Sequence, residues 1–562
     1  MEVTNQHVAA QLLLAGQLLE ITGDNVFKIR AFYRASDVVE RMAVPVTSLG
    51  EDELVRIPGI GTNIAHKILE MRDTGTFTEL ETLKKAVPEP LLNLLLLDGV
   101  GPKTVNKLWK KLNVQSIEDL ERAARGHRIR AVTGFGEKKE AGFLAAIRRF
   151  REEAGRMNRF EADEVVNRVE TMMQAGMYAV AGSYRRGRST IGDIDIVTTE
   201  PPGILNPRLR QIADAMIDEG DRKTSFRCLG KRVDVRFTKK YEFGSMLVYL
   251  TGSKAFNIHL RQIAMGKGYK LNEYGIEEQA TGKLHMFPDE RSLFAFLGLD
   301  EIPPELREDW GEVERAITHQ LPLLVGMKDI RGDLHVHSSW SDGQMTLEEL
   351  ASTGALLGYE YLLCSDHSVS LGIAHGLDET ALSKQQREIE RINRDSSCHI
   401  LSGTEVDILS DGTLGLPNSA LRDLDLVIAS VHSGLKQDRD QMTRRVIAAM
   451  ENDHVDIIGH PTGRLIGKRA ACDIDLPRII DQAAITGTAL ECNASPYRLD
   501  LDDVQIKQAI EKGVHISIGT DTHNATEFSE IRYGVLTTRR GWCTPSHLLN
   551  TRTEQELLAW AG

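Results

Sequence analysis

The period of the hydrophobic positions changes along the chain and divides it into three regions. Over the first 150 residues, apolar side chains recur at helical spacing, for example at Ile64 and Ile68. Glycine-containing turns at 57–61, 97–109 and 132–142 interrupt this pattern, and an amphipathic stretch follows each turn. The first region is therefore predicted to be helical and to repeat a helix-hairpin-helix unit.

From about residue 178 the pattern is typical of short strands, with a helix expected near 207–219. An α+β domain is predicted here. A segment rich in acid and proline, 298–332, separates it from the last region, where short apolar strands alternate with helical stretches. That alternation predicts a parallel β/α barrel. The strands expected in the α+β domain cover 178–184, 193–199, 231–238 and 245–252.

Composition excludes several classes of protein. The 562 residues are 41% hydrophobic and 27% charged, as in soluble globular proteins, and no apolar run approaches the ~18 residues that would span a membrane. The N-terminus lacks the features of a secretion signal, and the six cysteines show no CxxC pair. We expect several domains, reduced thiols and a cytoplasmic location.

The net charge of -13 is unevenly distributed. Residues 1–330 carry 47 basic and 47 acidic side chains, whereas residues 331–562 carry 21 and 34. Within the first part, residues 101–150 hold 12 basic against 5 acidic side chains. Such a local excess suits a phosphate backbone, although a solvated helix face would give the same count.

The glycine turns favour nucleic acid binding. Glycine has no Cβ, so its backbone N–H groups can approach a phosphate closely without reading bases. Two of the turns precede helices that carry lysine. The residues expected to contact DNA are Gly59, Gly61, Gly99, Gly101, Lys103 and Lys107, with Lys67 after the first turn.

A pair of carboxylates marks a site for phosphoryl transfer in the second region. Asp193 and Asp195 stand two apart in a predicted strand, so both point to one face and can hold two Mg²⁺ ions. Ser183 and Arg186, just upstream, offer donors to a triphosphate. Asp234, flanked by apolar residues in another predicted strand, is expected to be the third carboxylate.

These residues resemble the signature of the X family of DNA polymerases, the family that includes polymerase beta. The signature is GS-x-RRG followed by GD-x-D. The signature is matched at Gly182, Ser183, Arg185, Arg186, Gly187, Gly192, Asp193 and Asp195. The resemblance implies that Asp193 and Asp195 bind both Mg²⁺ ions, and that Asp234 joins one of them and favours deprotonation of the primer 3'-hydroxyl. It also implies that Gly182, Ser183, Arg186 and Gly192 surround the triphosphate.

A second family stretch, YLTGSKAFNIHLR, implies contacts with the incoming nucleotide and the template strand. Lys254 departs from polymerase beta, which is acidic at the matching place, so nucleotide selection is expected to differ. The residues concerned are Tyr249, Thr251, Gly252, Ser253 and Asn257 for the nucleotide, and Arg261 for DNA.

The N-terminal region resembles the family's deoxyribose phosphate lyase domain. Lys67 falls at the position of the amine that forms a Schiff base with the sugar. Asn63 stands where polymerase beta carries a phosphate-binding lysine. Two roles of Lys67 therefore stay open, lyase nucleophile and contact to the DNA backbone, and the second is preferred.

The last region contains nine potential metal ligands in short clusters, each after a predicted strand. Imidazole and carboxylate together favour zinc, manganese or iron. Asp366 and Asp407 are expected to support histidines from a second layer, and Arg464, Asn493 and Arg498 to hold a substrate phosphate. The nine ligands are His335, His337, Asp342, His367, Glu405, His432, His460, Asp521 and His523.

This pattern resembles the PHP (polymerase and histidinol phosphatase) domain, a distorted barrel of seven β/α units whose metals lie at the C-terminal ends of the strands. The resemblance implies up to three Mn²⁺ or Zn²⁺ ions and a manganese-dependent 3'-to-5' exonuclease. The resemblance also implies 3'-phosphatase or abasic-site endonuclease activity.

The whole chain is therefore expected to be a multidomain monomer that fills short gaps in DNA repair and processes 3' ends. Its partners would be gapped or primed double-stranded DNA and dNTPs, with no membrane. Two alternatives stay open: a template-independent nucleotidyltransferase, and a DNA-end scaffold with structural metals. The expected domains are a helical lyase-like domain (1–90), a helical fingers-type domain (91–155), a nucleotidyltransferase palm (156–243), a thumb (244–315), a linker (316–330) and a PHP barrel (331–562).

Overall fold

The computed structural model describes residues 5–40, 42, 45–97, 99–153, 155–371, 374–435 and 437–562. It divides into two compact units. The first contains the chain up to residue 154 together with 372–374 and 468–470, and the second contains the rest. No helix in the described ranges is long and apolar enough to cross a bilayer.

The first unit is helical throughout its described part, as predicted. Its core is built from the apolar faces of successive helices, including Leu12, Phe32 and Ile68. The predicted glycine turns lie between helices or directly before one. The helices are α1 (Asn5–Thr22), α2 (Val26–Glu40), α3 (Glu51–Arg56), α4 (Thr62–Thr74), α5 (Thr78–Ala86), α6 (Glu89–Leu92), α7 (Pro102–Leu112), α8 (Ile117–Arg125) and α9 (Glu137–Glu153), with 3-10 turns η1 (Val46–Ser48) and η2 (Asn93–Leu96).

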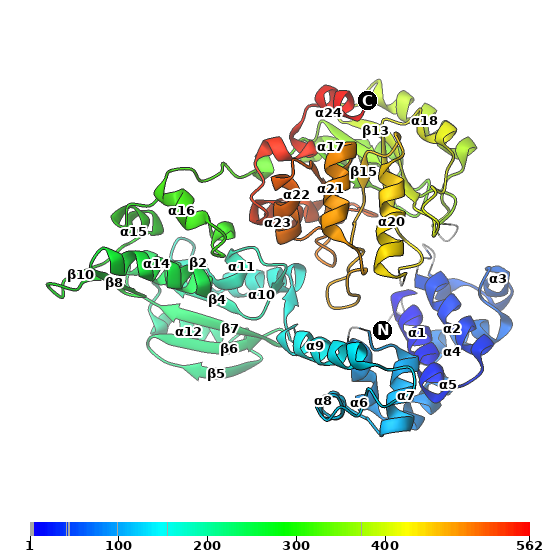
Figure 1. Ribbon diagram of the computed structural model, residues 1–562, viewed down its shortest axis with the longest axis horizontal. Helices are drawn as coiled ribbons and strands as arrows, with labels where there is room; N and C mark the ends of the chain where they lie inside the picture. Colours follow the sequence, from blue (N-terminus) through cyan, green and yellow to red (C-terminus); the bar gives the residue numbers. More distant parts are fainter. Residues whose placement is uncertain are drawn as a thin grey trace. The chain divides into compact units, whose positions relative to one another are not determined.

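The second unit begins with a five-stranded palm sheet whose strand order is β2-β4-β7-β6-β5 (Figure 1). Only β4 and β7 are parallel neighbours. Helices α10 (Arg159–Glu170) and α12 (Pro202–Leu209) contribute apolar side chains to the same core as the sheet. The strands are β2 (Tyr178–Val180), β4 (Ile194–Thr198), β5 (Ala215–Glu219), β6 (Lys223–Cys228) and β7 (Lys231–Phe237), and a separate ribbon pairs β1 (Met157–Asn158) with β3 (Thr190–Ile191).

Three local predictions in this region are wrong. The helix expected near 207–219 ends at Leu209, and 215–219 is the edge strand β5, because pairing with β6 outweighs the helix-forming side chains. The strand expected at 178–184 ends at Val180, and α11 (Gly182–Arg185) is a helical turn. The run expected as a strand at 245–252 is helical as far as Thr251, within α13 (Phe243–Thr251), since a short buried run does not reveal its period.

The thumb follows, and it extends into the segment that was expected to be a separator. Leu299, Ile302, Leu306 and Val313 lie in the same core as the thumb helices, so the first half of 298–332 is folded. The thumb elements are α13, α14 (Lys254–Gly266), a sheet of β8 (Tyr269–Asn272), β9 (Gly275–Glu278) and β10 (Leu284–His285), α15 (Glu290–Phe296), η3 (Pro304–Leu306) and α16 (Glu312–Ile317).

The last region forms a nearly closed barrel of seven parallel strands in sequential order, as predicted. The strands are β11 (Gly332–Val336), β12 (Tyr361–Cys364), β13 (His399–Asp407), β14 (Leu426–Ser430), β15 (Ile457–Ile458), β16 (Ala489–Asn493) and β17 (Ile516–Gly519). The helices are α17 (Leu347–Leu357), α18 (Glu379–Asn393), α19 (Asn418–Leu421), α20 (Arg439–Met450), α21 (Leu476–Thr486), α22 (Asp503–Glu511), α23 (Ile531–Arg540) and α24 (Glu554–Ala561).

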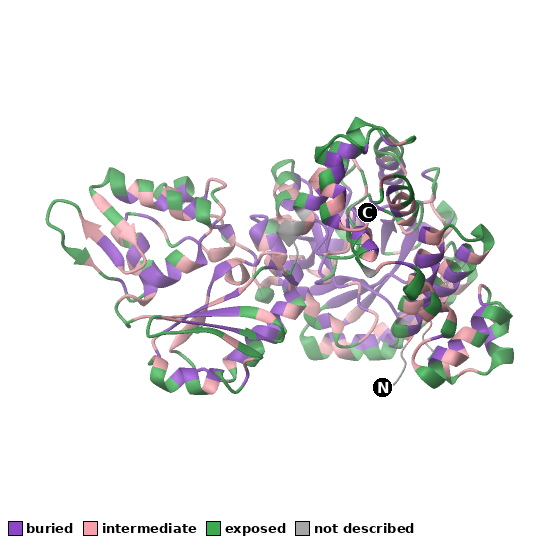
Figure 2. Ribbon diagram, turned by 90° about the horizontal axis from the view of Figure 1, so that it is seen from below, coloured by how far each residue is buried: buried purple, intermediate pink, exposed green. Residues whose placement is uncertain are grey.

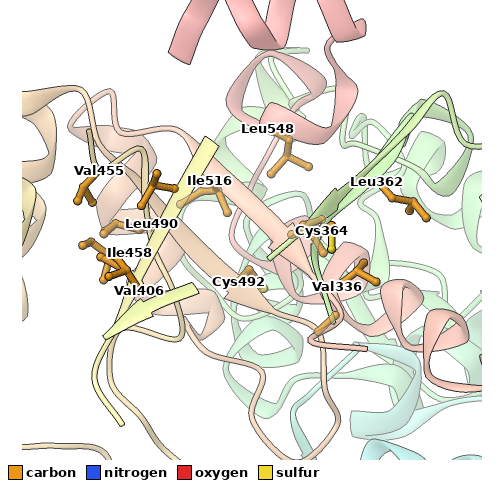
Figure 3. Close-up of a cluster of buried hydrophobic side chains, with 14 of the residues drawn as sticks. Val336, Leu362, Cys364, Val406, Val455, Ile458, Leu490, Cys492, Ile516 and Leu548 are labelled. Carbon is orange, nitrogen blue, oxygen red and sulfur yellow. The ribbon is translucent and has the colours of Figure 1, made fainter. Parts of the chain in front are cut away.

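Alternate side chains of the barrel strands belong to two separate cores. Leu362, Cys364 and Leu490 pack toward the surrounding helices (Figure 3). Tyr361 and Leu363, which alternate with them, join the other core, to which α24 also contributes. Figure 2 shows these strands buried and the outer faces of the helices exposed. The strands are therefore largely apolar on both faces away from their C-terminal ends, which explains their mostly hydrophobic sequence.

Candidate active sites

Three carboxylates meet on one face of the palm sheet. β4 and β7 run parallel with Asp195 directly opposite Asp234, and Asp193 lies just before β4. The alternating residues Ile194 and Ile196 point the other way, into the palm core. Because side chains alternate along a strand, the apolar residues that pack the sheet also fix the direction of the carboxylates. The structure thus brings together the three residues predicted for this site.

Gly182 allows this site to be tightly packed. A Cβ at Gly182 would lie 2.5 Å from Asp195 Oδ2, and the backbone there has a φ of +64°. The Ala181 N–H donates to the carbonyl of Asp195 at 2.7 Å, so the glycine-serine turn is fastened to β4. Any larger residue at 182 would displace the Asp195 carboxylate.

The carboxylates differ in their electrostatic setting. Burial raises the pKa of Asp195 to about 7, and the neighbouring Asp193 and Asp234 add to the effect. Burial acts on Asp234 in the same direction, but hydrogen bonds from Lys223, Ser225 and Arg232 outweigh it and lower its pKa. Lys223 Nζ lies 2.7 Å from Asp234 Oδ2. Crowding of three negative groups is relieved by divalent cations, so the donor set fits Mg²⁺.

The two arginines of the GS-x-RRG stretch have different partners. Arg185 donates to both oxygens of buried Glu290, at 2.7 and 2.8 Å, and to Thr251 Oγ1. Arg186 Nε lies 3.0 Å from Glu308 Oε1, and its Nη1 donates to the carbonyl of Thr251. Sequence reasoning did not identify Glu290 or Glu308, because isolated glutamates carry no motif.

The residues predicted around the nucleotide gather at the start of α14. Ser253 caps this helix, and Gly252 lies beside Arg186. Asn257 Nδ2 donates to the carbonyl of Tyr249 at 2.7 Å. The Arg261 guanidinium lies 5.6 Å from the centre of the Tyr249 ring. This cluster connects α13 with α14 and presents polar side chains next to Arg186.

The predicted DNA contacts in the first unit differ in their surroundings, and a Cβ on Gly59 would lie 3.0 Å from Val38 Cγ2. No atom of the described chain lies within 4 Å of a Cβ built on Gly99 or Gly101, so a phosphate has access there. Lys103 is 86% exposed. Lys67 is different: its ammonium lies 2.9 Å from Glu79 Oε2 and over the rings of Phe32 and Phe77. A Schiff-base nucleophile would have to leave Glu79 in order to reach the sugar.

The nine predicted ligands of the barrel converge at the C-terminal ends of its strands. His335 and Glu405 belong to β11 and β13, and the others follow strand ends or lie in adjacent loops. Glu405 is the common centre, with one oxygen 2.9 Å from His367 Nδ1 and the other 3.2 Å from His432 Nε2 and 3.0 Å from His460 Nε2. All the strands except β16 supply a ligand at or just after their C-terminal ends.

Ligand atoms within 4.8 Å of one another form three overlapping groups. Two of the groups share His337 and two share His367, so bound cations would be neighbours. The groups are His337, Asp342, His367 and His523; His335, His337 and Asp521; and His367, Glu405 and His432.

Several buried ligand atoms in the described ranges have no hydrogen-bond partner. They include both ring nitrogens of His337 and both oxygens of Glu405, whose close contacts with the histidines do not have hydrogen-bond geometry. Leaving such atoms unsatisfied costs several kcal/mol in total, at about 1–3 kcal/mol each. A cation on each group would satisfy them, so the residues present fit a polynuclear site for zinc or manganese.

The charge states of His337 and Glu405 suit the same interpretation. Burial lowers the pKa of His337 to about 4, helped by His523 and His367, so this ring is neutral and can donate a lone pair. Burial opposes ionisation of Glu405, but the surrounding His432, His335 and His367 hold its pKa well below the ordinary value. Neutral imidazole and ionised carboxylate are the forms that bind metal. Burial acts against protonation of His335, His432 and His523, but neighbouring carboxylates outweigh it and raise their pKa, so these rings must lose a proton to bind metal.

A second layer of carboxylates orients the histidines. His432 Nδ1 lies 2.8 Å from Asp407 Oδ1, as predicted, and His335 Nδ1 lies 2.7 Å from Glu491 Oε1. Sequence reasoning did not identify Glu491. The signal that could have found it is a single carboxylate within the strand predicted at 488–495. Asp366 does not contact a histidine among the described residues: it accepts from Ser338 and Gln385, which corrects the prediction for this residue.

The residues suggested for a substrate phosphate separate into two kinds. Asn493 Nδ2 lies 3.2 Å from Asp521 Oδ2, and Arg498 Nε lies 3.5 Å from the same oxygen, so both adjoin the ligands. Arg464 instead donates to the carbonyls of Arg498 and Leu499 and fastens the loop. Its guanidinium is held by these carbonyls and by Asp502 Oδ2, 3.3 Å from Nη1.

Family comparisons agree with the order of the regions. A helix-hairpin-helix domain matches residues 3–77, and a SAM-like helix-hairpin-helix tandem matches 91–148. The DNA polymerase beta palm matches 150–228, and the DNA polymerase beta thumb matches 246–308.

Individual relatives extend this likeness over the chain. It is 38% identical over 558 residues to the DNA polymerase/3'-5' exonuclease PolX of Bacillus subtilis, covering 96% of both chains. It is 28% identical over 343 residues to rat DNA polymerase lambda, covering 54% of this chain and 56% of the relative. A probable phosphatase of Thermoanaerobacter is 29% identical over 231 residues, which cover 39% of this chain and 89% of the relative.

Proposed function

The chain belongs to the X family of DNA polymerases, and we propose that it fills short gaps in duplex DNA and trims 3' ends at a second site in its barrel. The observation that carries this is the completeness of both sites. Asp193, Asp195 and Asp234 converge in the palm. In the barrel, eight of the nine ligands fall into the three groups, and His460 adjoins them through Glu405. A noncatalytic DNA-end scaffold would not require both sets. The helix-hairpin-helix regions count against a template-independent nucleotidyltransferase.

In the palm, Asp193 and Asp195 would hold two Mg²⁺ ions, and Asp234 would share one of them. Bound there, the ions would activate the primer hydroxyl and neutralise the triphosphate. Asp234 stays ionised beside Lys223, so it binds a cation without first losing a proton. Arg186 and Ser183 would orient the triphosphate, with Tyr249 and Asn257 beside the nucleotide.

In the barrel, the nine ligands would hold up to three Mn²⁺ or Zn²⁺ ions. Such ions generate hydroxide near neutral pH and polarise a phosphodiester. Asp407 and Glu491 keep His432 and His335 oriented, while Asn493 and Arg498 would contact the phosphate. The resulting activity is a 3'-to-5' exonuclease, with 3'-phosphatase and abasic-site endonuclease action as further proposed reactions.

Other assignments follow from this role. We assign Lys67 to the DNA backbone, since Glu79 holds its ammonium, and a lyase reaction would require that ion pair to open. We place the protein in the cytoplasm as a monomer that binds gapped or primed DNA and dNTPs. We also propose that the domains span residues 1–90, 91–155, 156–243, 244–315 and 331–562, with a linker at 316–330.

The double variant Asp193→Ala plus Asp195→Ala tests the polymerase site. Without these carboxylates the cations lose their ligands, so extension of a primer across a gapped duplex with Mg²⁺ should fall at least ~10³-fold. Manganese-stimulated 3' degradation should be retained, which also controls for folding. Extension at the normal rate would refute the assignment.

The variants His337→Ala and His432→Ala test the barrel site. Each removes a ligand, so 3' degradation and the metal content of the purified protein should both decrease, with a rate loss of roughly 100-fold. Primer extension serves as the control and should persist. Unchanged degradation would place the nuclease elsewhere.

A further inference from the structure

The GS-x-RRG turn of the palm lies on helix α23 of the barrel, within one compact unit. A Cβ on Gly187 would lie 2.7 Å from Leu536 Cγ, so the turn packs against this helix without a gap. Tyr184 and Tyr533 both donate to buried Asp163, at 2.9 and 2.7 Å. The barrel thus contacts the back of the segment that is assigned to the triphosphate.

Arg540, at the end of α23, reaches the same turn. Its side chain is 1% exposed, and its Nη1 lies 2.6 Å from the carbonyl of Arg186 and 3.1 Å from Glu308 Oε1. Its Nε lies 2.8 Å from Asp503 Oδ2, which fixes the guanidinium from the other side. Glu308 Oε1 in turn lies 3.0 Å from Arg186 Nε. One carboxylate oxygen therefore joins the barrel arginine to the palm arginine.

These contacts fix the orientation of the Arg186 guanidinium. Glu308 holds its Nε, and the Thr251 carbonyl holds its Nη1, whereas Nη2 makes no hydrogen bond to any described residue. Two fixed nitrogens define the plane of the group, so the third points in a set direction. An arginine clamped in this way loses little rotamer freedom when it binds phosphate.

We propose that Glu308 and Arg540 are positioning residues for the polymerase reaction, through which the barrel sets the affinity of the palm for the incoming nucleotide. This inference rests on the proposed role of Arg186. Neither residue touches the nucleotide: Glu308 aims the Arg186 guanidinium, and Arg540 keeps Glu308 in place and neutralises it. The barrel is then part of the nucleotide-binding apparatus as well as a nuclease.

The experiment measures single-nucleotide insertion into a one-nucleotide gapped duplex by the full chain, with KM for the dNTP, kcat and the affinity for DNA determined separately. Glu308→Gln keeps the shape but weakens the hold on Arg186, so KM for the dNTP should rise about five- to tenfold. Arg540→Lys keeps the charge but loses the fork that bridges Glu308 and Asp503, and it should raise KM in the same direction. DNA affinity, Tm and nuclease rate should stay near those of the unmodified protein.

A matched control comes from the same segment. Glu305 lies in η3 and pairs with the neighbouring Arg539 of α23 at 2.9 Å, but it has no contact with Arg186 among the described residues. Glu305→Gln is therefore the same chemical change at the same interface, and it should leave KM unchanged. An equal rise of KM in Glu305→Gln would overturn the proposal, because the effect would then come from the interface in general.

The variant Arg186→Ala separates this inference from the proposed contact of Arg186 with the triphosphate. If Arg186→Ala leaves KM for the dNTP unchanged, the role of Arg186 itself is wrong, and the inference is overturned with it. If Arg186→Ala raises KM while Glu308→Gln and Arg540→Lys do not, the triphosphate assignment stands and the positioning role is overturned. A rise in all three, with Glu305→Gln unaffected, supports the proposal.

Discussion

Asp195 and Asp234 are neighbours because β4 and β7 pair in parallel with these residues in register. Burial and the negative charges of Asp193 and Asp234 raise the pKa of Asp195 to about 7. Gly182 makes the crowding feasible, since any Cβ there would collide with the carboxylate. In the barrel the same problem is solved differently, with histidines interleaved among the carboxylates.

A half-buried acid away from both sites, Asp456, gives a prediction about stability. Burial raises the pKa of Asp456 to about 7, above its unfolded value near 4. The folded state therefore retains a proton that the unfolded state has lost between these values. Stability due to this group is full below about pH 4 and declines as the pH rises to about 7.

Asp456→Asn removes this pH dependence. Asparagine stays neutral and can still accept the hydrogen bond from the Val427 N–H, which is 2.8 Å long. We expect Tm at pH 8 to rise by about 2–4 °C, corresponding to roughly 1 kcal/mol, with a smaller change at pH 5. Asp453→Asn, an exposed acid nearby, is the control. A pH-independent shift would show that Asp456 is not the titrating group.

At the scale of elements, α7 is the best-formed candidate for gripping DNA. It begins directly after Gly101, and Lys103 and Lys107 lie on it four residues apart. Lys107 packs over the ring of Phe135 from the third glycine turn, at 5.6 Å. Two of the repeated hairpin units are therefore joined at this lysine.

The variant Lys103→Ala plus Lys107→Ala should weaken binding to gapped duplex regardless of its sequence. Each phosphate contact releases counterions, so the slope of log K against log salt should decrease in magnitude by about 1–2. Lys84→Ala plus Lys85→Ala, in the last turn of α5, removes the same charge from the same unit. Fluorescence anisotropy at several salt concentrations measures the DNA affinity of both double variants. Equal losses of affinity would argue against α7 as the DNA-binding helix.

Some elements could be predicted and others could not. The barrel strands were found because buried parallel strands are apolar on both faces and alternate with helices. Residues 245–252 are equally apolar but form a helix, and β5 has side chains suited to a helix but forms an edge strand. In both cases the partners that decide the outcome, α15 and β6, lie elsewhere in the chain.

At the scale of the whole molecule, the distribution of charge indicates which regions bind DNA. The acidic balance of residues 331–562 disfavours DNA binding by the barrel, while the basic excess of 101–150 favours it. We therefore expect the nuclease to depend on DNA held by the helical unit. The palm contributes its own part, because its GS-x-RRG turn is fastened to the barrel through α23.

The same lysine variant tests this dependence. Lys103→Ala plus Lys107→Ala should lower kcat/KM for manganese-dependent cleavage of a duplex 3' end about tenfold, since two phosphate contacts are lost. Hydrolysis of a small chromogenic phosphodiester, which needs no grip on DNA, should not change. A parallel loss with both substrates would indicate damage to the barrel itself.

The sequence by itself determined which chemistry the chain carries: the GD-x-D carboxylates, the nine ligands and the glycine turns are local patterns whose spacing reflects strand and turn geometry. Only the tertiary structure decided what surrounds them. Glu308, Glu290, Glu491 and Arg540 are single charged residues without a motif, and each has its role because folding places an opposite charge or a histidine beside it. Ion pairs between distant segments depend on packing, and that is why the connection between barrel and palm could not be predicted from the sequence.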